Sequence, residues 1–203
     1  MSDSKTLFRE VNNHYDALLQ SKEESHAKVG WGSRESQLLR FDVLFDFTEL
    51  TGARVLDVGC GLGAMWEYLN EKGISCSYMG WDLSPAMIEQ ASQLYPEAEF
   101  RCVNFLDDEA SGESFDVVFL SGALNLPVDG QPAVFLRAIE RLYALSIRAA
   151  AFTVLSSKAD FLEPGEWYGS PGKIMEFCLT LTRKVVLRHD YMPHDFSLCM
   201  YHE

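Results

Sequence analysis

A short apolar run, a turn with glycine at every second position and a helix-like segment follow one another in RVLDVGCGLGAMWEYL, residues 54–69. Residues 54–59 have the composition of a buried strand, and residues from about 63 to 72 are predicted to form a helix. Gly59 and Gly61 permit positive φ angles and let a ligand approach the backbone closely. A strand that passes through such a turn into a helix predicts a ligand site at the carboxyl end of the strand.

Strand-like and helix-like segments alternate along the rest of the chain. Further strands are predicted at residues 75–82, 99–104, 114–122 and 150–156, and further helices at about 131–146 and 173–182, with one more that starts at Ser84 and Pro85. The final two runs, 184–191 and 196–202, are joined by a segment too short for a crossover helix, so they should be antiparallel neighbours. This order predicts an α/β fold, a doubly wound parallel sheet with helices on both faces and one antiparallel strand.

The first fifty residues have a different, helical pattern. Apolar side chains recur there at helical spacing, at Leu7, Val11, Tyr15, Leu18 and Leu19. After a break, Ser33 is placed to cap a second helix over about residues 34–50. We therefore expect two parts, an N-terminal helical cap over residues 1–50 and a core domain over residues 51–203.

Composition narrows the possible partners. The chain has 203 residues and a net charge of −13, and it contains no apolar run long enough to cross a membrane. Its start lacks the basic and apolar regions of a secretory signal, so a cytoplasmic location is expected. Only a short basic cluster, residues 182–189, is available to neutralise phosphates, which disfavours nucleic acid as the substrate. The five scattered cysteines, without histidines at zinc spacing, predict no metal site.

Two acids stand close to the glycine turn. Asp57 precedes Gly59 by two residues, and Asp82 ends the next predicted strand. Gly59, Gly61 and Ala64 also satisfy the pattern G-x-G-x-x-G/A, so the turn suits either a dinucleotide or another adenosine cofactor. A carboxylate at position 57 would repel a pyrophosphate but tolerate a cationic ligand such as S-adenosylmethionine. A carboxylate at position 82 can accept hydrogen bonds from both ribose hydroxyls in either case.

Four segments in order, VLDVGCGLG, YMGWDLSPAMIEQA, FRCVNFLD and FDVVFLSGALNL, resemble the motifs of class I S-adenosylmethionine-dependent methyltransferases. The resemblance covers about residues 54–156. It implies a Rossmann-like seven-stranded sheet of order 3-2-1-4-5-7-6 with strand 7 antiparallel, and S-adenosyl-L-methionine as cofactor. The sequence has SGALNLP where amino-methylating members carry Asn/Asp-Pro-Pro-Tyr/Phe, so methylation of a nucleobase or a glutamine is not expected.

The resemblance also implies roles for individual residues. The methionine half of the cofactor would lie against Asp57, Gly59, Cys60, Gly61 and Gly63. The ribose and adenine would contact Asp82, Leu83, Met87, Asn104 and Phe105, with Asn104 in place of the usual aspartate. The sulfonium and the methyl acceptor would be faced by Ser121, Gly122 and Asn125.

Residues outside these motifs are expected to complete the site. Trp31, in a link that holds two glycines, is placed to close over the cofactor, and Arg40 or Arg34 to pair with its methionine carboxylate. Trp167 and Tyr168 are expected to wall the acceptor pocket. No residue is assigned as catalytic, because methyl transfer from a sulfonium mainly needs alignment and exclusion of water.

The resulting hypothesis is a methyltransferase of class EC 2.1.1.- that acts on an O, N or S atom of a small molecule, as a monomer or homodimer. Three alternatives stay open at this point. They are a protein or tRNA methyltransferase, a non-catalytic S-adenosylmethionine-binding module and a dinucleotide-dependent oxidoreductase.

Overall fold

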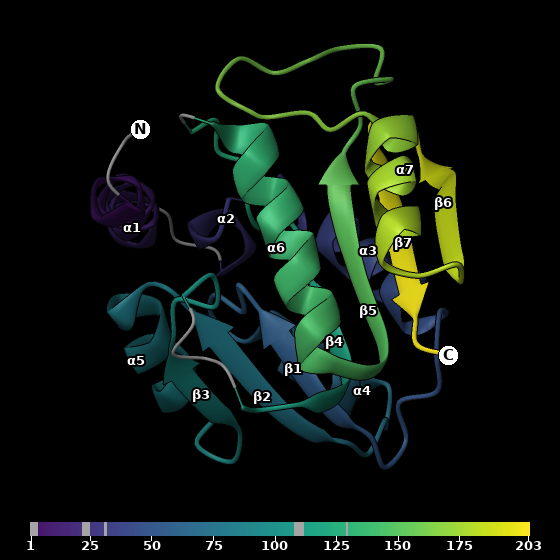
Figure 1. Ribbon diagram of the computed structural model, residues 1–203. Helices are drawn as coiled ribbons and strands as arrows, with labels where there is room; N and C mark the ends of the chain where they lie inside the picture. Colours follow the sequence, from purple (N-terminus) through teal and green to yellow (C-terminus); the bar gives the residue numbers. More distant parts are fainter. Residues whose placement is uncertain (1–3, 22–24, 31, 108–111, 129) are drawn as a thin grey trace.

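The computed structural model describes residues 4–21, 25–30, 32–107, 112–128 and 130–203. Within them, seven strands form one sheet of order β3-β2-β1-β4-β5-β7-β6 (Figure 1). The strands are β1 (Arg54–Val58), β2 (Ser77–Asp82), β3 (Glu99–Cys102), β4 (Phe115–Leu120), β5 (Ser146–Leu155), β6 (Val185–Met192) and β7 (Asp195–Tyr201). The order is the one that the sequence predicts.

Strand directions also follow the prediction. β1 pairs in parallel with β2 and β4, β2 with β3, and β4 with β5. β7 lies between β5 and β6 and is antiparallel to both. β5 starts at Ser146, four residues before the predicted start, because it follows α6 without a loop: the Ser146 hydroxyl donates to Tyr143 O at 2.8 Å and its backbone is already extended. The carboxyl ends of β1, β2 and β4 therefore meet at one edge of the sheet.

Seven helices are described. They are α1 (Ser4–Ser21), α2 (Ser25–Lys28), α3 (Arg34–Phe45), α4 (Ala64–Glu71), α5 (Pro85–Leu94), α6 (Gln131–Leu145) and α7 (Pro171–Leu181). Two predicted N-caps are confirmed: Ser33 Oγ accepts from Ser36 N at 3.1 Å, and Ser84 Oγ accepts from Met87 N at 3.2 Å. α3 ends at Phe45 rather than near residue 50, because the chain tightens there into turns with hydrogen bonds between residues three apart.

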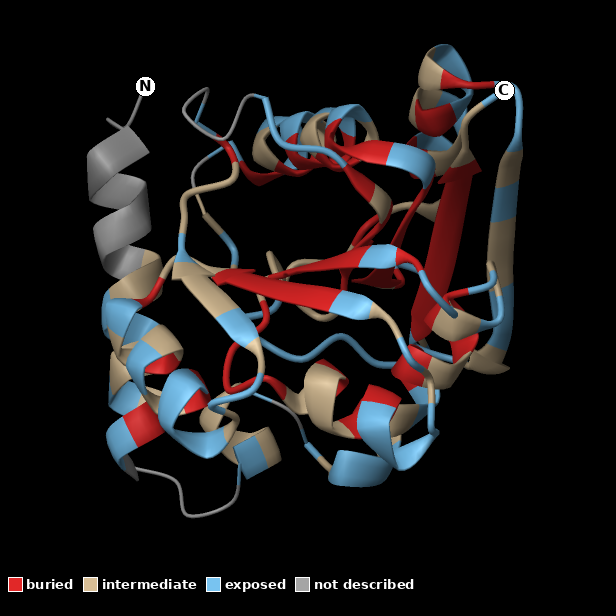
Figure 2. Cartoon of the chain, turned by 90° about the horizontal axis from the view of Figure 1, so that it is seen from below, coloured by how far each residue is buried: buried red, intermediate tan, exposed pale blue. Residues whose placement is uncertain are grey.

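Helices cover both faces of the sheet. α6 and α7 lie on one face (Figure 1), where Phe135 and Ile174 pack on strand residues such as Val118. α3 and α4 lie on the other face, where Phe41 and Leu69 pack in a second cluster. The central strands are buried nearly throughout, whereas the edge strands β3 and β6 are partly exposed (Figure 2). The core is therefore two apolar layers separated by the sheet.

The N-terminal helix α1 packs against α2 and α5. Ser84 Oγ donates to Asp16 Oδ1 at 3.1 Å, which joins α1 to the turn after β2. Leu19, Leu62 and Met87 form a small buried cluster beneath it. α1 thus lies over the region where β1 and β2 end. The division into a cap over residues 1–50 and a core over 51–203 stays a prediction.

Among the residues that the structure describes, no helix is both long and apolar enough to cross a membrane.

Candidate functional site

A cavity opens at the carboxyl ends of β1, β2 and β4, under α1. Its wall comes from helix α1, Val29 after α2, helix α3, the glycine turn, the segments that follow β2 and β3, the segment between β4 and α6, and the start of α6. Its lining includes Val11, Tyr15, Gln37, Phe41, Asp57, Gly59, Cys60, Gly61, Asp82, Leu83, Met87, Asn104, Phe105, Ser121, Gly122, Leu124, Leu126, Val128, Gln131 and Val134. This is the edge at which ligands bind in open α/β sheets.

The turn after β1 accepts no side chain at its two inner glycines. Gly59 has a φ of 73°, and a Cβ there would come within 2.7 Å of the Ala123 side chain. Gly61 has a φ of 51°, and a Cβ there would lie 2.7 Å from the Val29 side chain. Glycine is required at both positions because a larger residue would be strained and would also collide. The turn therefore brings bare backbone up to the cavity, as the sequence predicts.

Gly63 is placed differently from the other two. It caps α4 with a φ of 82°, and a Cβ there would lie 2.8 Å from the Phe100 ring. It is not among the lining residues of the cavity. Its structural role is to let α4 start tight against the sheet.

Asp57 is a buried carboxylic acid at the floor of the cavity. It is 3% exposed, and Tyr78 on the neighbouring strand donates its hydroxyl hydrogen to Asp57 Oδ2 at 2.9 Å. Burial raises the pKa of Asp57 to about 7, although the hydrogen bond from Tyr78 acts in the opposite direction. In the described part of the chain the hydrogen-bond donor to this carboxyl is a neutral hydroxyl, so a cationic ligand beside it would favour its ionised form.

Asp82 is fixed by two backbone donors. Gly61 N donates to Oδ2 at 2.8 Å, and Ser84 N donates to Oδ1 at 2.9 Å. Burial raises the pKa of Asp82, while these backbone N–H groups act to lower it. Each carboxylate oxygen keeps a lone pair for a further donor, so a diol at the cavity wall finds two oriented acceptors.

The residues expected at the adenine also line the cavity. These are Leu83 and Met87 after β2, and Asn104 and Phe105 after β3. Asn104 Oδ1 accepts from Leu106 N at 3.2 Å, which orients its amide. Apolar side chains on one wall and an amide on the next suit a flat heteroaromatic ring.

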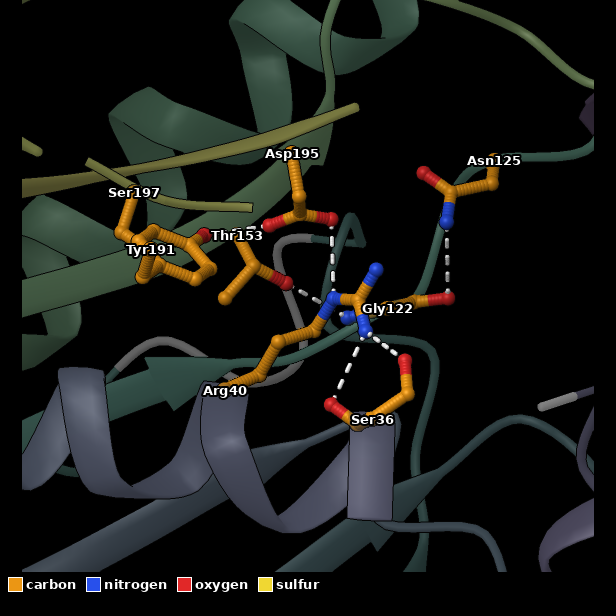
Figure 3. A network of polar contacts seen from close by, with 8 residues as sticks. All are labelled: Ser36, Arg40, Gly122, Asn125, Thr153, Tyr191, Asp195 and Ser197. Atoms are coloured by element: carbon orange, nitrogen blue, oxygen red, sulfur yellow. Dashed lines mark hydrogen bonds and ion pairs between the residues drawn. The ribbon is translucent and has the colours of Figure 1, made fainter. Parts of the chain in front are cut away.

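The segment after β4 forms the remaining wall (Figure 3). Ser121 and Gly122 line the cavity, and Gly122 N donates to Thr153 Oγ1 on β5 at 3.0 Å. Asn125 does not line it; its Nδ2 donates to Gly122 O at 3.3 Å and supports the segment from behind. The bond to Thr153 fixes this segment to β5 at the place where the methyl acceptor is expected from the sequence.

Arg40 is placed elsewhere than expected. Its Nε donates to Asp195 Oδ2 at 2.8 Å and its Nη1 to Ser36 O at 2.9 Å, with both charged side chains 3% exposed (Figure 3). Arg40 is not among the described lining residues, and it joins α3 to β7 rather than facing the cavity. Arg34 forms exposed ion pairs with Glu67 and Glu71. The structure thus does not bring either arginine to the expected carboxylate site.

The expected aromatic wall is also placed away from the cavity. The Trp167 ring lies 4.9 Å from that of Phe135, between centroids, and the backbone N–H of Trp167 donates to Asn125 O at 2.6 Å. The Tyr168 hydroxyl accepts from Glu163 N at 2.8 Å. Neither residue lines the cavity. Trp31 lies outside the described residues.

Several lining residues were not predicted from the sequence. Gln37 is 5% exposed and stands one helical turn before Phe41 on α3, and Gln131 is 4% exposed at the start of α6. A glutamine on the apolar face of a helix is the signal that would have pointed to them. Tyr15 comes from α1, where burial raises the pKa of its hydroxyl to about 12, so it stays protonated.

The sheet order, the acid before a glycine turn and the second acid at the end of β2 together define the class I S-adenosylmethionine-dependent methyltransferases. The chain belongs to this family, whose cofactor is S-adenosyl-L-methionine. A sequence model described as a methyltransferase domain matches residues 55–144. Membership removes the dinucleotide-dependent oxidoreductase from the alternatives.

Proteins of similar sequence are also named as methyltransferases. Rv1506c of Mycobacterium tuberculosis, whose name places it among methyltransferases, is 30% identical over 152 residues, which is 70% of this chain and 89% of the relative. A ubiquinone biosynthesis O-methyltransferase of Neisseria meningitidis serogroup A is 33% identical over 110 residues. That match covers 51% of this chain and 45% of the relative, so the chain spans less than half of that protein.

Solved structures share the fold. Magnesium protoporphyrin IX methyltransferase from Synechocystis PCC 6803, with bound SAH, has a TM-score of 0.72 at 14% identity, over 99% of this chain and 100% of that one. An O-methyltransferase family protein from Burkholderia thailandensis has a TM-score of 0.68 at 18% identity, over 98% of this chain and 62% of that one.

Proposed function

We propose that the protein methylates a small, uncharged molecule, with the cofactor held along the carboxyl ends of β1, β2 and β4. The observation that carries this proposal is the buried acid Asp57, which lines the cavity beside the glycine turn and has Tyr78 as its hydrogen-bond donor. Such an acid suits the ammonium group of S-adenosylmethionine and opposes a diphosphate.

The residues present fit the rest of the cofactor. Gly59 and Gly61 leave the backbone bare for the methionine chain, and Cys60 stands between them. Asp82 would accept from the ribose hydroxyls, because two backbone N–H groups already orient its oxygens. Leu83 and Met87 would pack on the adenine, and Asn104 and Phe105 would meet its edge.

When bound, the cofactor supplies an activated methyl group for in-line displacement by the acceptor atom. The protein's own part is to align the acceptor and to exclude water. Ser121 and Gly122 would face the acceptor, since the bond from Gly122 to Thr153 fixes this segment. Tyr15 and Val11 of α1 would cover the opposite side of the cavity.

Charge favours a neutral acceptor. The charged side chains among the described lining residues are Asp57 and Asp82, both acids, so an anionic molecule would be repelled. One relative is named as a ubiquinone biosynthesis O-methyltransferase. This name supports a small-molecule acceptor over a protein or tRNA.

Calorimetric titration of the purified protein with S-adenosylhomocysteine and, separately, with NADH tests the proposal. We expect micromolar binding of the first and none of the second, and loss of the first in Asp82→Ala. A panel of uncharged and anionic small molecules, assayed for release of S-adenosylhomocysteine, then tests the acceptor class. Turnover with anionic acceptors alone, or with tRNA or protein alone, would contradict it.

A further inference from the structure

Three buried polar atoms between β4 and α6 have no hydrogen-bond partner in the described part of the chain. They are Ser121 Oγ, Asn125 Oδ1 and Gln131 Oε1. Ser121 and Gln131 line the cavity, and Asn125, four residues after Ser121, does not. A buried polar atom without a partner costs about 1–3 kcal/mol, so three of them close together in the sequence need an explanation.

The two amides have a defined orientation. Gln131 Nε2 donates to Leu124 O, and Asn125 Nδ2 donates to Gly122 O at 3.3 Å. A backbone carbonyl can only accept, so the amide nitrogen must face it and the amide oxygen must be the atom left over. The two free atoms are therefore obligate acceptors. Ser121 Oγ can accept as well.

Gln131 is the member that reaches the cavity most clearly. It is 4% exposed, it lines the cavity, and it is the first residue of α6. Its nitrogen holds Leu124, which has a φ of 67° and is the one non-glycine residue with a positive φ in the described ranges. Backbone strain of this kind collects at functional sites. Gln131 thus fixes a strained segment with its amide nitrogen, while its amide oxygen stays buried and without a partner in a residue that lines the cavity.

The lining residues that stand near Gln131 in the sequence are apolar. They are Leu124, Leu126, Val128 and Val134. A ligand here finds acceptor oxygens set in a hydrocarbon wall, which favours an apolar molecule that carries its own N–H or O–H group.

We propose that Gln131, together with Ser121, recognises a hydrogen-bond donor on the methyl acceptor, and so selects uncharged, mainly apolar molecules with an O–H or N–H group. Asn125 supports this wall through its hydrogen bond to Gly122 O. The inference rests on the proposed function, because it assigns the substrate class of the same site. A site that binds a donor through buried oxygens rejects analogues that lack the donor, since those oxygens then stay unpaired.

Matched probes test this in the protein saturated with S-adenosylhomocysteine. The pairs are 2-naphthol with 2-methoxynaphthalene and indole with benzothiophene, which differ mainly in the donor. Binding is measured by ligand-observed NMR titration. We expect the donor-bearing member of at least one pair to bind about tenfold more tightly, as one hydrogen bond to a buried acceptor implies.

Two variants make the test specific. In Gln131→Met we expect the preference for the donor to fall to about twofold or less, while affinity for S-adenosylhomocysteine changes little. Gln93→Met, at an exposed glutamine of α5 that is not among the lining residues of the cavity, is the control and should keep the preference. Ser121→Ala, which leaves the Gln131–Leu124 bond intact, should reduce the preference in part.

The outcomes separate this inference from the proposed function. Equal binding of both members in every pair, or a preference that survives in Gln131→Met, would overturn the inference alone. Loss of S-adenosylhomocysteine affinity in Gln131→Met with the preference intact would show that the glutamine reads the cofactor instead. Failure of the unaltered protein to bind S-adenosylhomocysteine would overturn the proposed function and this inference with it.

Discussion

The hydroxyl of Tyr78 on β2 donates a hydrogen bond of 2.9 Å to Oδ2 of Asp57 on β1; both residues are buried, and Asp57 lines the cavity. The two strands are parallel neighbours, with Tyr78 opposite Val55, so the two side chains share a face of the sheet. The bond orients the carboxylate and lowers its pKa against the effect of burial. The Asp57 carboxylate is thus oriented to bind a cation in the cavity.

Replacing Tyr78 with phenylalanine should weaken cofactor binding. The hydroxyl is lost, so the pKa of Asp57 rises further and less of the carboxylate is ionised at neutral pH. We expect the Kd for S-adenosylhomocysteine at pH 7 to rise about tenfold, the amount expected for a hydrogen bond to a charged group. Calorimetric titration measures it. Tyr68→Phe is the control, because the Tyr68 hydroxyl contacts Asp42 at 3.0 Å instead. The Kd of this variant for S-adenosylhomocysteine should stay unchanged.

The raised pKa of Asp57 also predicts a pH dependence of stability. Burial moves it from 3.8 to about 7 in the folded protein, so between these values the folded state binds more protons than the unfolded chain. The contribution of this group is fully present below its unfolded pKa and is lost as pH rises through about 7.

Urea unfolding of the unaltered protein and of Asp57→Asn, at pH 5 and pH 8, measures this contribution. From pH 5 to pH 8, we expect the free energy of unfolding of the unaltered protein to fall by about 2–3 kcal/mol more than that of the variant. A difference between them that does not change with pH would mean that Asp57 is ionised throughout.

Glycine at position 61 should be essential for binding but not for folding. Gly61→Ala places a methyl group against Val29 at a φ of 51°, so we expect loss of S-adenosylhomocysteine affinity by at least about tenfold. Gly73→Ala is matched in conformation, with a φ of 69°, but has open space around it. It should cost about 1 kcal/mol of stability and leave affinity unchanged. Partial recovery in Gly61→Ala/Val29→Ala would identify the collision as the cause.

The buried pair of Arg40 and Asp195 should be important for stability. Burial raises the pKa of Asp195 and Arg40 acts to lower it, so Arg40→Met leaves a buried acid without its cation. We expect a loss of about 3–5 kcal/mol in urea unfolding. Arg34→Met, which removes exposed pairs with Glu67 and Glu71, should cost about 1 kcal/mol or less. Equal losses in the two variants would contradict this role for Arg40.

Much of the fold could be predicted from the sequence because its signals are local. The glycine turn, the Ser33 and Ser84 caps and the short link before β7 each act over a few residues. The start of β5 could not be predicted, since Ser146 to Arg148 are not an apolar run and join the strand through pairing with neighbours far along the chain.

The candidate site divides in the same way. Asp57, Asp82 and the glycines were predicted because each lies at or just after the end of a strand that the sequence indicates. The partner of Arg40 lies 155 residues away on β7, and no local pattern indicates it. Gln131 was missed because its importance depends on the conformation of Leu124, which the sequence does not reveal.

The central claim is that Asp57 binds the ammonium group of the cofactor. The most direct test compares the affinities of S-adenosylhomocysteine and its analogue without the amino group, in the unaltered protein and in Asp57→Asn. We expect the unaltered protein to prefer the amino compound by about tenfold or more, and the variant to bind both about equally. A preference of the same size in both proteins would contradict the account, because the carboxylate would then have no part in recognising the cation.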